Sequence, residues 1–334
     1  MGITTAIEYC DSSVNPVMGC TGCELWHRDP DKSHCYAAAL CNRYGGGNNK
    51  GWPADFHHPE HFPGRLEKAI RWPDLTGADR PGKPWLNGLP RIIFVNDLGD
   101  GFCPTAPDPW QWLAPHIMAM ASSPHIYLLL TKWPGCMAGF FAARSRVPPN
   151  FILGTTITSQ DTARRLQVLF ELAFQSGPLN LWVSCEPLLG PVDLSEPCLE
   201  ELSYDFPDTV SLLRDNGHTL WIAAGGESGR NARPWHPDWA LLLRDQCLRA
   251  GVPFFWKQNG EWLPAETPEG AGTYARVSPD GKLMTDERHR SIAFSSVVRD
   301  WGWYLVNRVG KKRAGRLLRG EEWSQMPALP WKGA

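Results

Sequence analysis

The 334-residue chain has no long apolar run and no strong excess of charge of one sign. No stretch approaches the roughly 18 consecutive apolar residues of a membrane-spanning helix, and the N-terminal MGITTAIEYCDSS lacks a basic segment followed by an apolar one. The net charge of -2 excludes a general attraction to nucleic acid or to an anionic membrane. We therefore expect a soluble, cytoplasmic protein that does not contact membranes and that binds nucleic acid only through a local patch.

The chain also lacks internal repeats and low-complexity tracts, which excludes a solenoid. Hydrophobic residues make up 43% of it and charged residues 20%, a balance typical of a globular protein with a sizeable core. Seventeen tryptophans either line the pocket of a planar substrate or pack a Trp-rich barrel. The sequence leaves these two interpretations open.

Short apolar runs alternate along the chain with stretches of helical periodicity. An early strand is expected at Thr5–Tyr9, and further strand candidates are Arg91–Asn96, His125–Thr131, Phe151–Thr156, Leu181–Ser184, Thr219–Ala224 and Val252–Trp256. The helical patterns between them cover Trp110–Ser122, Gln160–Gln175 and Pro237–Ala250. Such alternation is typical of parallel strands connected by helices. We predict an α/β fold, namely a partial or complete parallel (β/α) barrel with loop insertions and a helical C-terminal extension.

Two segments interrupt the alternation. Tyr44–Pro90 is rich in glycine, proline and histidine, and Glu261–Thr285 has the composition of loops or a hairpin. We predict a barrel over residues 1–260 with an insertion at about 44–90, and a C-terminal extension over 261–334 that contains a basic helix. The cationic residues of that extension are Arg308, Lys311, Lys312, Arg313, Arg316 and Arg319.

Three cysteines follow the first expected strand with the spacing C-x2-C-x11-C, at Cys20, Cys23 and Cys35. Thiolates bind soft metals, and the cytosol keeps thiols reduced, so these residues are candidate metal ligands. The spacing is compatible with an iron–sulfur cluster, with zinc completed by His27 or His34, or with unliganded core cysteines. In a four-iron cluster, three cysteines leave one iron open, as a reactive cluster requires. The remaining cysteines are scattered and are interpreted as small core residues.

Several phrases of the chain resemble a known family. They are IEYCDSSVNPVMGC, SHCYAA, LLTKWP, SCEPLLGPVDL, AAGGESGRNARPWHPDW and VPFFWKQNGEW, together with the tail VGKKRAGRLLRGEEWSQMP. In this order they resemble a phage and bacterial family, of largely uncharacterised function, that is related to the radical S-adenosylmethionine enzymes. The resemblance covers nearly the whole chain, and it implies a barrel of the radical S-adenosylmethionine type, located in the host cytoplasm if a phage encodes it.

The resemblance implies a [4Fe-4S] cluster on Cys20, Cys23 and Cys35 that binds S-adenosylmethionine at its open iron. One departure is the spacing, since the related enzymes commonly carry C-x3-C-x2-C. The longer loop must fold back to bring Cys35 beside the other two cysteines. By its place before the last cysteine, His34 corresponds to an aromatic residue that lies against the adenine.

Polar residues follow the expected strands at the end where barrel enzymes have their active sites. If the resemblance holds, Asp97 accepts a bond from the methionine ammonium, Lys132 meets the methionine carboxylate, and threonine hydroxyls suit the ribose. For each residue alone, a capping or turn role at the strand end is the alternative. The cofactor-binding candidates at these ends are Asn96, Asp97, Thr131, Lys132, Thr156 and Ser184.

The later strands end in a second set of polar residues. The stretch GGESGRNARP follows the sixth barrel strand, and its glycines permit close approach of backbone to a ligand. We assign Gly226, Glu227, Arg233 and Gln258 to substrate binding, and Glu186 and Lys257 to catalysis. A lysine and an amide at such a site orient a planar, hydrogen-bonding molecule such as a nucleobase.

The sequence therefore supports two hypotheses of different classes. The first is a radical S-adenosylmethionine enzyme, supplied by an external electron donor, that isomerises or otherwise modifies a nucleobase such as a thymine derivative in phage DNA. The second is a non-catalytic, zinc-stabilised nucleic-acid-binding protein. In both, the basic C-terminal segment either contacts phosphates or is a solvated helix face.

Overall fold

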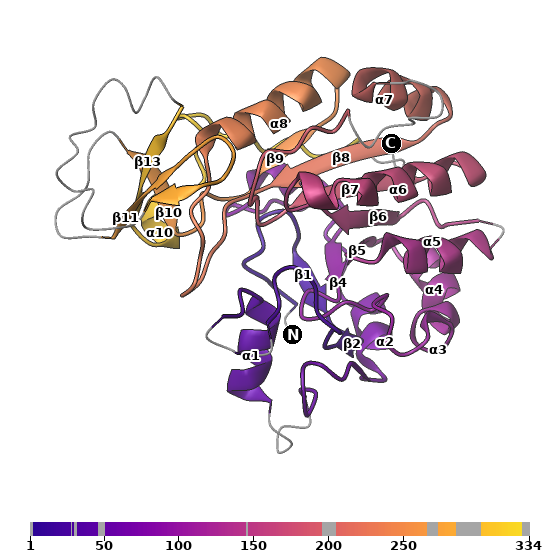
Figure 1. Ribbon diagram of the computed structural model, residues 1–334. Coiled ribbons are helices and arrows are strands. Elements are labelled where there is room, and N and C mark those ends of the chain that lie inside the picture. Colours follow the sequence, from indigo (N-terminus) through magenta and orange to yellow (C-terminus); the bar gives the residue numbers. More distant parts are fainter. Residues whose placement is uncertain are drawn as a thin grey trace.

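Figure 1 shows a computed structural model of the chain. It describes residues 3–27, 29, 32–45, 51–144, 146–195, 205–265, 273–284 and 302–328. Among the helices of these residues, none is long and apolar enough to cross a membrane.

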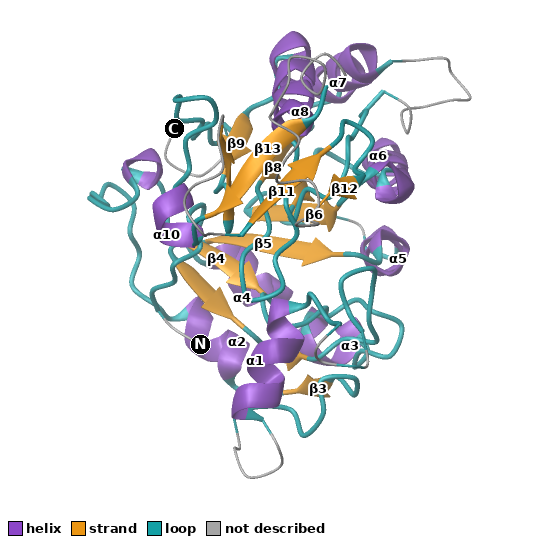
Figure 2. Cartoon of the chain, turned by 60° about the vertical axis from the view of Figure 1, so that its left-hand side comes forward, coloured by secondary structure: helices purple, strands orange, loops and turns teal. Residues whose placement is uncertain are grey.

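Seven parallel strands form the main sheet, and their order in space follows their order in the chain. The sheet curls into a half-barrel, with β1 and β9 at its two edges (Figures 1 and 2). This confirms the predicted α/β fold and, of the two forms predicted, favours the partial barrel. The strands are β1 (Ser12–Val14), β4 (Ile92–Val95), β5 (Ile126–Thr131), β6 (Phe151–Thr156), β7 (Asn180–Cys185), β8 (Thr219–Ala224) and β9 (Phe254–Trp256).

Helices connect the strands and cover the convex face of the sheet (Figure 1). The expected helix Trp110–Ser122 is divided into three parts, because Pro115 lacks the N–H that a continuous helix needs. The expected helix Pro237–Ala250 forms with those bounds. The elements of this layer are α3 (Pro109–Trp112), η2 (Ala114–His116), α4 (Ile117–Ser122), α5 (Pro134–Ala142), η3 (Gln160–Thr162), α6 (Arg164–Gln175), α7 (Phe206–Asp215) and α8 (Pro237–Ala250).

Alternate strand residues face opposite sides of the sheet. Ile93 and Leu129 pack with the helices, whereas the concave face carries a separate aromatic cluster. At its centre Trp182 and Trp221 stack with ring centroids 5.5 Å apart, and Tyr9 meets both rings edge-on. These tryptophans are fully buried and pack the concave face of the half-barrel.

The expected strand Thr5–Tyr9 is wrong, since the first strand of the sheet is β1. The physical reason lies in Lys83, whose ammonium donates to the carbonyls of Thr5, Ile7 and Cys10 at 2.6–2.8 Å. Carbonyls bound to a lysine do not pair in a strand ladder. The segment instead inserts Tyr9 into the concave face.

The segment between β1 and β4 carries the cysteine loop and forms one wall beside the strand ends. Its described elements are β2 (Val17–Met18), α1 (Tyr36–Tyr44), β3 (Glu60–His61), α2 (Arg65–Ile70) and η1 (Pro84–Leu86). The guanidinium of Arg65 ties the segment together by donating to the carbonyls of Asn15 and Gly51.

The C-terminal part, predicted as a helical extension that contains a basic helix, forms a second sheet. The strands lie in the order β10 (Trp262–Ala265), β13 (Tyr304–Arg308), β11 (Tyr274–Val277) and β12 (Leu283–Met284). The only helix of its described residues, α10 (Lys311–Ala314), has four residues, because glycines flank it on both sides. Within Glu261–Thr285, where loops or a hairpin were expected, β11 and β12 form an antiparallel hairpin, and β10 pairs with β13.

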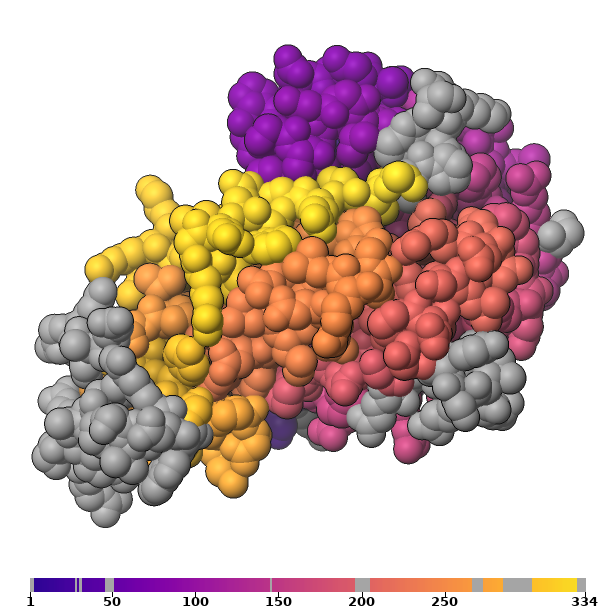
Figure 3. Space-filling view, turned by 90° about the horizontal axis from the view of Figure 1, so that it is seen from above, coloured from indigo at the N-terminus to yellow at the C-terminus, as the bar shows by residue number. Residues whose placement is uncertain are grey.

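The last described residues close one edge of the half-barrel. Ser324 bridges to Phe255 of β9, and the amide of Trp256 donates to the carbonyl of Trp323 at 2.9 Å. The guanidinium of Arg316 lies 4.0 Å from the ring centroid of Trp85. In the space-filling view the yellow C-terminal residues run between the violet and the orange parts of the chain (Figure 3).

Candidate functional site

The carboxyl ends of the parallel strands open into a cavity of about 330 Å³. Of the residues assigned to the site from sequence, Arg233 alone does not line it. Carboxyl ends of parallel strands share one edge of a sheet, which is why residues far apart in the chain meet here. The predicted residues that line the cavity are Cys20, Cys23, His34, Cys35, Asn96, Asp97, Thr131, Lys132, Thr156, Ser184, Glu186, Gly226, Glu227, Lys257 and Gln258.

The loop between β2 and α1 brings the cysteines to the cavity. Glu24 in this loop accepts two bonds of 3.0 Å from the guanidinium of Arg165 on α6, which pins the loop across the sheet. Burial would raise the pKa of Glu24, but the Arg165 bonds lower it below its ordinary value. Cys35 is the N-cap residue of α1; burial raises the pKa of its thiol, and the nearby amides of Ala38 and Ala37 offset part of this rise. These amides favour the thiolate that a metal ligand requires.

Cys103 is a cysteine that the sequence pattern assigned to the core and that contacts Cys20. A hydrogen bond between the Cys20 and Cys103 side chains lowers the pKa of Cys103. The same bond, together with burial, raises the pKa of Cys20. The cysteine spacing carries no signal for this pair, because Cys103 follows β4, far along the chain from the cysteine loop.

Three thiols line the cavity, and thiolates are ligands of soft metals. In the part of the chain that the structure describes, no three histidine, cysteine, aspartate or glutamate side chains are grouped closely enough to hold a metal ion. Cys20, Cys23 and Cys35 nevertheless line the same cavity, and burial keeps the pKa of Cys35 above its ordinary value. Three thiols on one cavity fit the donor chemistry of an iron–sulfur cluster.

Asp97 and Lys132 are charged residues whose side chains form no ion pair with a described residue. Burial raises the pKa of Asp97, and bonds from Asn15 and Ser13 offset part of this effect. The Asn15 amide lies 2.7 Å from Oδ1 of Asp97. Burial alone would lower the pKa of Lys132, but the nearby Cys23, Glu24 and Asp100 side chains raise it above its ordinary value. The cavity therefore offers one carboxylate and one ammonium to a ligand.

Asn96 and Thr131, in contrast, are occupied by bonds within the protein. Oδ1 of Asn96 accepts from the amide of Val17 at 3.0 Å, and its φ of 65° is a left-handed value that asparagine tolerates. The Thr131 hydroxyl donates to Asp100 at 2.8 Å. Asp100 was missed in the sequence, although it follows β4 closely, and it also accepts from the amides of Phe102 and Lys132. These residues hold the strand ends in place.

Glu186 joins two other polar residues on the far side of the cavity. Its Oε2 accepts from the ammonium of Lys257 at 2.9 Å and from the hydroxyl of Tyr9 at 3.2 Å. Burial would lower the pKa of Lys257, but Glu186 raises it above its ordinary value. Burial and Glu186 together raise the pKa of Tyr9 well above its usual range. Tyr9 thus belongs to the site, although the sequence pattern assigned it to a strand.

The loop after β8 is held by one ion pair and by close backbone contacts. Both oxygens of Glu227 accept from the guanidinium of Arg233, at 2.7 and 2.8 Å. A side chain on Gly226 would place its Cβ 2.2 Å from the carbonyl oxygen of Asn259, so only glycine fits there. Arg233 therefore acts behind Glu227 and does not face the cavity.

Four buried polar atoms at the cavity have no hydrogen-bond partner among the described residues. They are Oε2 of Glu8, Nδ1 of His34, Oε1 of Glu186 and Oε1 of Gln258, although Nδ1 of His34 lies 3.7 Å from Oε2 of Glu227. Buried polar atoms are nearly always hydrogen-bonded in native proteins, and leaving one unpaired costs about 1–3 kcal/mol. Their convergence on one cavity indicates a polar ligand that completes these bonds.

Comparison with known proteins gives the family of the chain. A family model described as "Protein of unknown function (DUF5131)" matches residues 4–327. The chain belongs to this family. No curated protein and no solved structure matches it significantly. The matched range includes the cysteine loop, the half-barrel and the C-terminal sheet.

The basic residues of the C-terminal segment are used in different ways. Arg316 pairs with Glu322 at 2.8 Å, and Arg319 donates to the hydroxyl of Tyr304 at 3.0 Å. Lys311 lines the cavity and lies 3.6 Å from Glu8. Much of the positive charge of this segment is therefore engaged in contacts within the chain.

Proposed function

We propose that the chain is a radical S-adenosylmethionine enzyme that carries a [4Fe-4S] cluster on Cys20, Cys23 and Cys35. The observation that supports this most is the meeting of these cysteines with unpaired charged groups in one cavity at the strand ends. When bound, the cluster and S-adenosylmethionine supply reductive cleavage of a sulfonium bond and abstraction of a hydrogen atom from a substrate. An external electron donor provides the electron.

In this proposal, charged and hydroxyl groups bind the cofactor. Asp97 accepts from the ammonium of the methionine part, and Lys132 donates to its carboxylate. Thr156 and Ser184, both on the cavity wall, suit the ribose hydroxyls. His34 lies against the adenine. The ammonium and the carboxylate of the cofactor would thus pair with Asp97 and Lys132, which have no ion-pair partner among the described residues.

The substrate meets Glu186, Lys257 and Gln258. Glu186 and Lys257 hold a proton between them on the cavity wall and pass it to or from the substrate, and Oε1 of Gln258 accepts a bond from it. A planar, hydrogen-bonding nucleobase suits these groups, and our leading candidate is a thymine derivative in phage DNA that is isomerised or otherwise modified. Glu227 and Arg233 keep the shape of the cavity on this side.

Anaerobic cluster loading tests the cysteine assignment. The parent protein should take up about four iron and four sulfide per chain, and Cys20→Ala, Cys23→Ala and Cys35→Ala should each prevent this. Cys136→Ala is the matched control, because Cys136 is exposed and does not line the cavity. Full loading in all three variants would overturn the assignment.

Turnover tests the activity itself. The loaded protein, incubated anaerobically with S-adenosylmethionine and dithionite, should release 5′-deoxyadenosine and methionine. The three cysteine variants should release none above the rate of dithionite alone. A loaded parent protein that releases no 5′-deoxyadenosine would refute the proposed function.

One observation favours a second candidate, a zinc-stabilised protein without catalysis. His34 lines the cavity with the three cysteines, and its Nδ1 has no hydrogen-bond partner among the described residues. Three cysteines and one histidine are a common zinc site. His27 is the poorer fourth ligand, since it does not line this cavity and its Nδ1 accepts from the amide of Asp29 at 2.9 Å. Stoichiometric zinc in a colourless protein, with no iron uptake, would decide for this candidate.

A further inference from the structure

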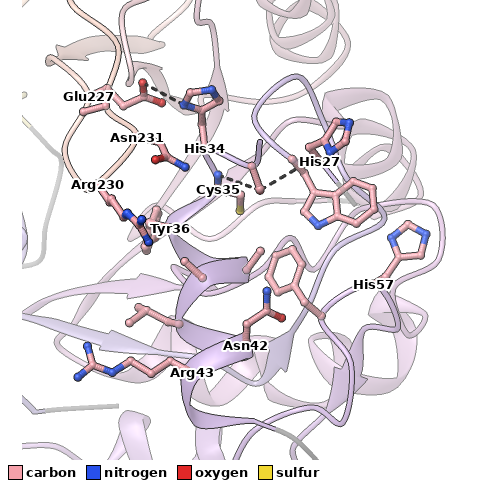
Figure 4. A pocket seen from close by; sticks show the side chains of 18 of the residues that line it. His27, His34, Cys35, Tyr36, Asn42, Arg43, His57, Glu227, Arg230 and Asn231 are labelled. Atoms are coloured by element: carbon pink, nitrogen blue, oxygen red, sulfur yellow. Dashed lines mark hydrogen bonds and ion pairs between the residues drawn. The ribbon is translucent and has the colours of Figure 1, made fainter. Parts of the chain in front are cut away.

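A second, larger cleft of about 830 Å³ lies beside the cavity, between α1 and the loop after β8. The two spaces share six lining residues, namely His34, Cys35, Tyr36, Phe56, Glu227 and Ser228. In the close view, Arg230 and Asn231 lie on one side of the cleft and His57 on the other (Figure 4). A ligand in this cleft therefore has direct access to the residues at the strand ends.

The charge of the cleft favours an anionic ligand. Arg43 on α1 and Arg230 on the loop after β8 are both exposed, and neither guanidinium pairs with a carboxylate of the described residues. Of the two carboxylates of the lining, Glu227 is paired with Arg233, and Asp55 lies 2.8 Å from Nδ1 of His58. Two guanidinium groups, which the close view shows apart from one another, thus remain for phosphates (Figure 4).

The loop that carries Arg230 is fixed before any ligand binds. The guanidinium of Arg308 donates to the carbonyls of Gly229 and Arg230, and the amide of Gly229 donates to Glu261 at 3.1 Å. The backbone of this loop therefore loses little freedom when a ligand binds, which favours affinity.

The opposite side of the cleft offers an aromatic surface. The rings of Trp26 and His57 stack with centroids 4.7 Å apart and planes 12° from parallel. Trp26 also lies against Gly22, in the loop that carries Cys20 and Cys23, where an added Cβ would be 2.8 Å from the ring. Stacking of a base on such a ring is tolerant of sequence and is typical of proteins that bind single-stranded nucleic acid.

We propose that this cleft binds a nucleotide strand, with separate phosphates at Arg43 and at Arg230 and a base on the Trp26 and His57 rings. The inference rests on the proposed function, because it names the surface that delivers a nucleobase to the strand ends. Single-stranded nucleic acid and a free nucleotide present the same chemistry. The cleft, more than the basic C-terminal segment, then carries the phosphate contacts.

Fluorescence anisotropy of the loaded protein with a labelled single-stranded DNA 12-mer tests the phosphate contacts. Arg43→Ala and Arg230→Ala should each weaken binding at low salt by about threefold to tenfold and lower the slope of log K against log salt by about 0.7. Arg249→Ala on α8 is the control, an exposed arginine outside both spaces, and should change neither. Parent-like affinity and salt slope in both cleft variants would overturn the inference.

His57→Ala and Trp26→Ala test the aromatic surface. Removal of one stacking ring should weaken binding by about fivefold or more. Because Trp26 packs against the cysteine loop, iron content is measured in parallel, and His57→Ala supplies the test if Trp26→Ala fails to load. Unlabelled thymidine monophosphate competes if the ligand is a free nucleotide, whereas only strands compete if it is nucleic acid.

These outcomes separate the inference from the proposed function. A loaded protein that forms 5′-deoxyadenosine but binds neither the 12-mer nor the nucleotide refutes the inference alone. A protein that binds the 12-mer through Arg43 and Arg230, but forms no 5′-deoxyadenosine, refutes the proposed function and supports the nucleotide site.

Discussion

Two groups of polar side chains share the carboxyl end of the sheet, and they differ in how fully the protein satisfies them. Asp100 accepts from Thr131 and from two amides, and Glu227 binds Arg233 through both oxygens. Asp97 has no ion-pair partner among the described residues, and one oxygen of Glu186 has no bond there. The first group holds the frame of the cavity, and the second is available to a ligand. Burial alone does not distinguish these roles; the bonding of each oxygen does.

The largest expected effect concerns the frame. Gly226→Ala would force a Cβ to 2.2 Å from the carbonyl oxygen of Asn259, and backbone atoms cannot yield as a side chain can. We expect a loss of more than about 3 kcal/mol in the free energy of unfolding, seen in urea denaturation or as insoluble protein. Gly139→Ala in α5 is the control, since its Cβ meets nothing within 4 Å, and it should be neutral or slightly stabilising. Equal stability of the two variants would show that the loop after β8 is not rigid.

The next effect separates the two groups directly. Asp97→Asn, Lys132→Met and Glu186→Gln should keep the parent iron content and melting temperature within a few degrees. Formation of 5′-deoxyadenosine should fall about tenfold or more in at least two of them, since each removes a charge-assisted bond worth about 1.5–3 kcal/mol. Glu227→Gln should instead leave the formation of 5′-deoxyadenosine near the parent rate and lower the free energy of unfolding. The loss should be only about 1–2 kcal/mol, because Arg233 is partly exposed and solvent screens the ion pair. A similar loss of stability in all four variants would show that both groups of polar residues serve the fold.

A smaller effect is expected in the pH dependence of stability. Because burial raises the pKa of Asp97, the folded protein binds more protons than the unfolded chain between the ordinary and the raised pKa. Stability should therefore fall as the pH rises through this window, and Asp97→Asn should remove that part of the fall. The difference in free energy of unfolding between Asp97→Asn and the parent should grow in favour of the variant as the pH rises. A difference that is constant with pH would mean that a partner stabilises the carboxylate.

Much of the fold was predictable from the sequence. Most of the site residues were predictable too, because they follow the predicted strands directly. The bounds of β6, β8 and α8 are as predicted, because buried apolar runs and the terminal Gly251 identify them. The polar residues just beyond such runs fall on one cavity because the carboxyl ends of parallel strands meet. Sequence could not reveal the bond between Cys103 and Cys20, nor the pairing of β10 and β11 with β13, because both depend on partners distant in the chain.

The smallest effect concerns the basic C-terminal segment. Replacing Lys311, Lys312 and Arg313 with alanine should weaken single-stranded DNA binding and lower the salt slope by at most about 0.7 for each phosphate that these residues neutralise. Lys311 already lies near Glu8, so we expect less than the full effect. Fold and iron content should persist in this variant. A decrease in slope larger than that of Arg43→Ala and Arg230→Ala together would assign the phosphates to this segment and not to the cleft.

The strand-like bridge between Ser324 and Phe255 has a consequence for folding during synthesis. During synthesis the half-barrel emerges first, and the backbone of β9 stays uncovered until residues 323–325 leave the ribosome. An uncovered strand edge is a template for pairing with other chains. A product that stops before Trp323 would therefore contain every cysteine of the proposed cluster and still expose an aggregation-prone edge.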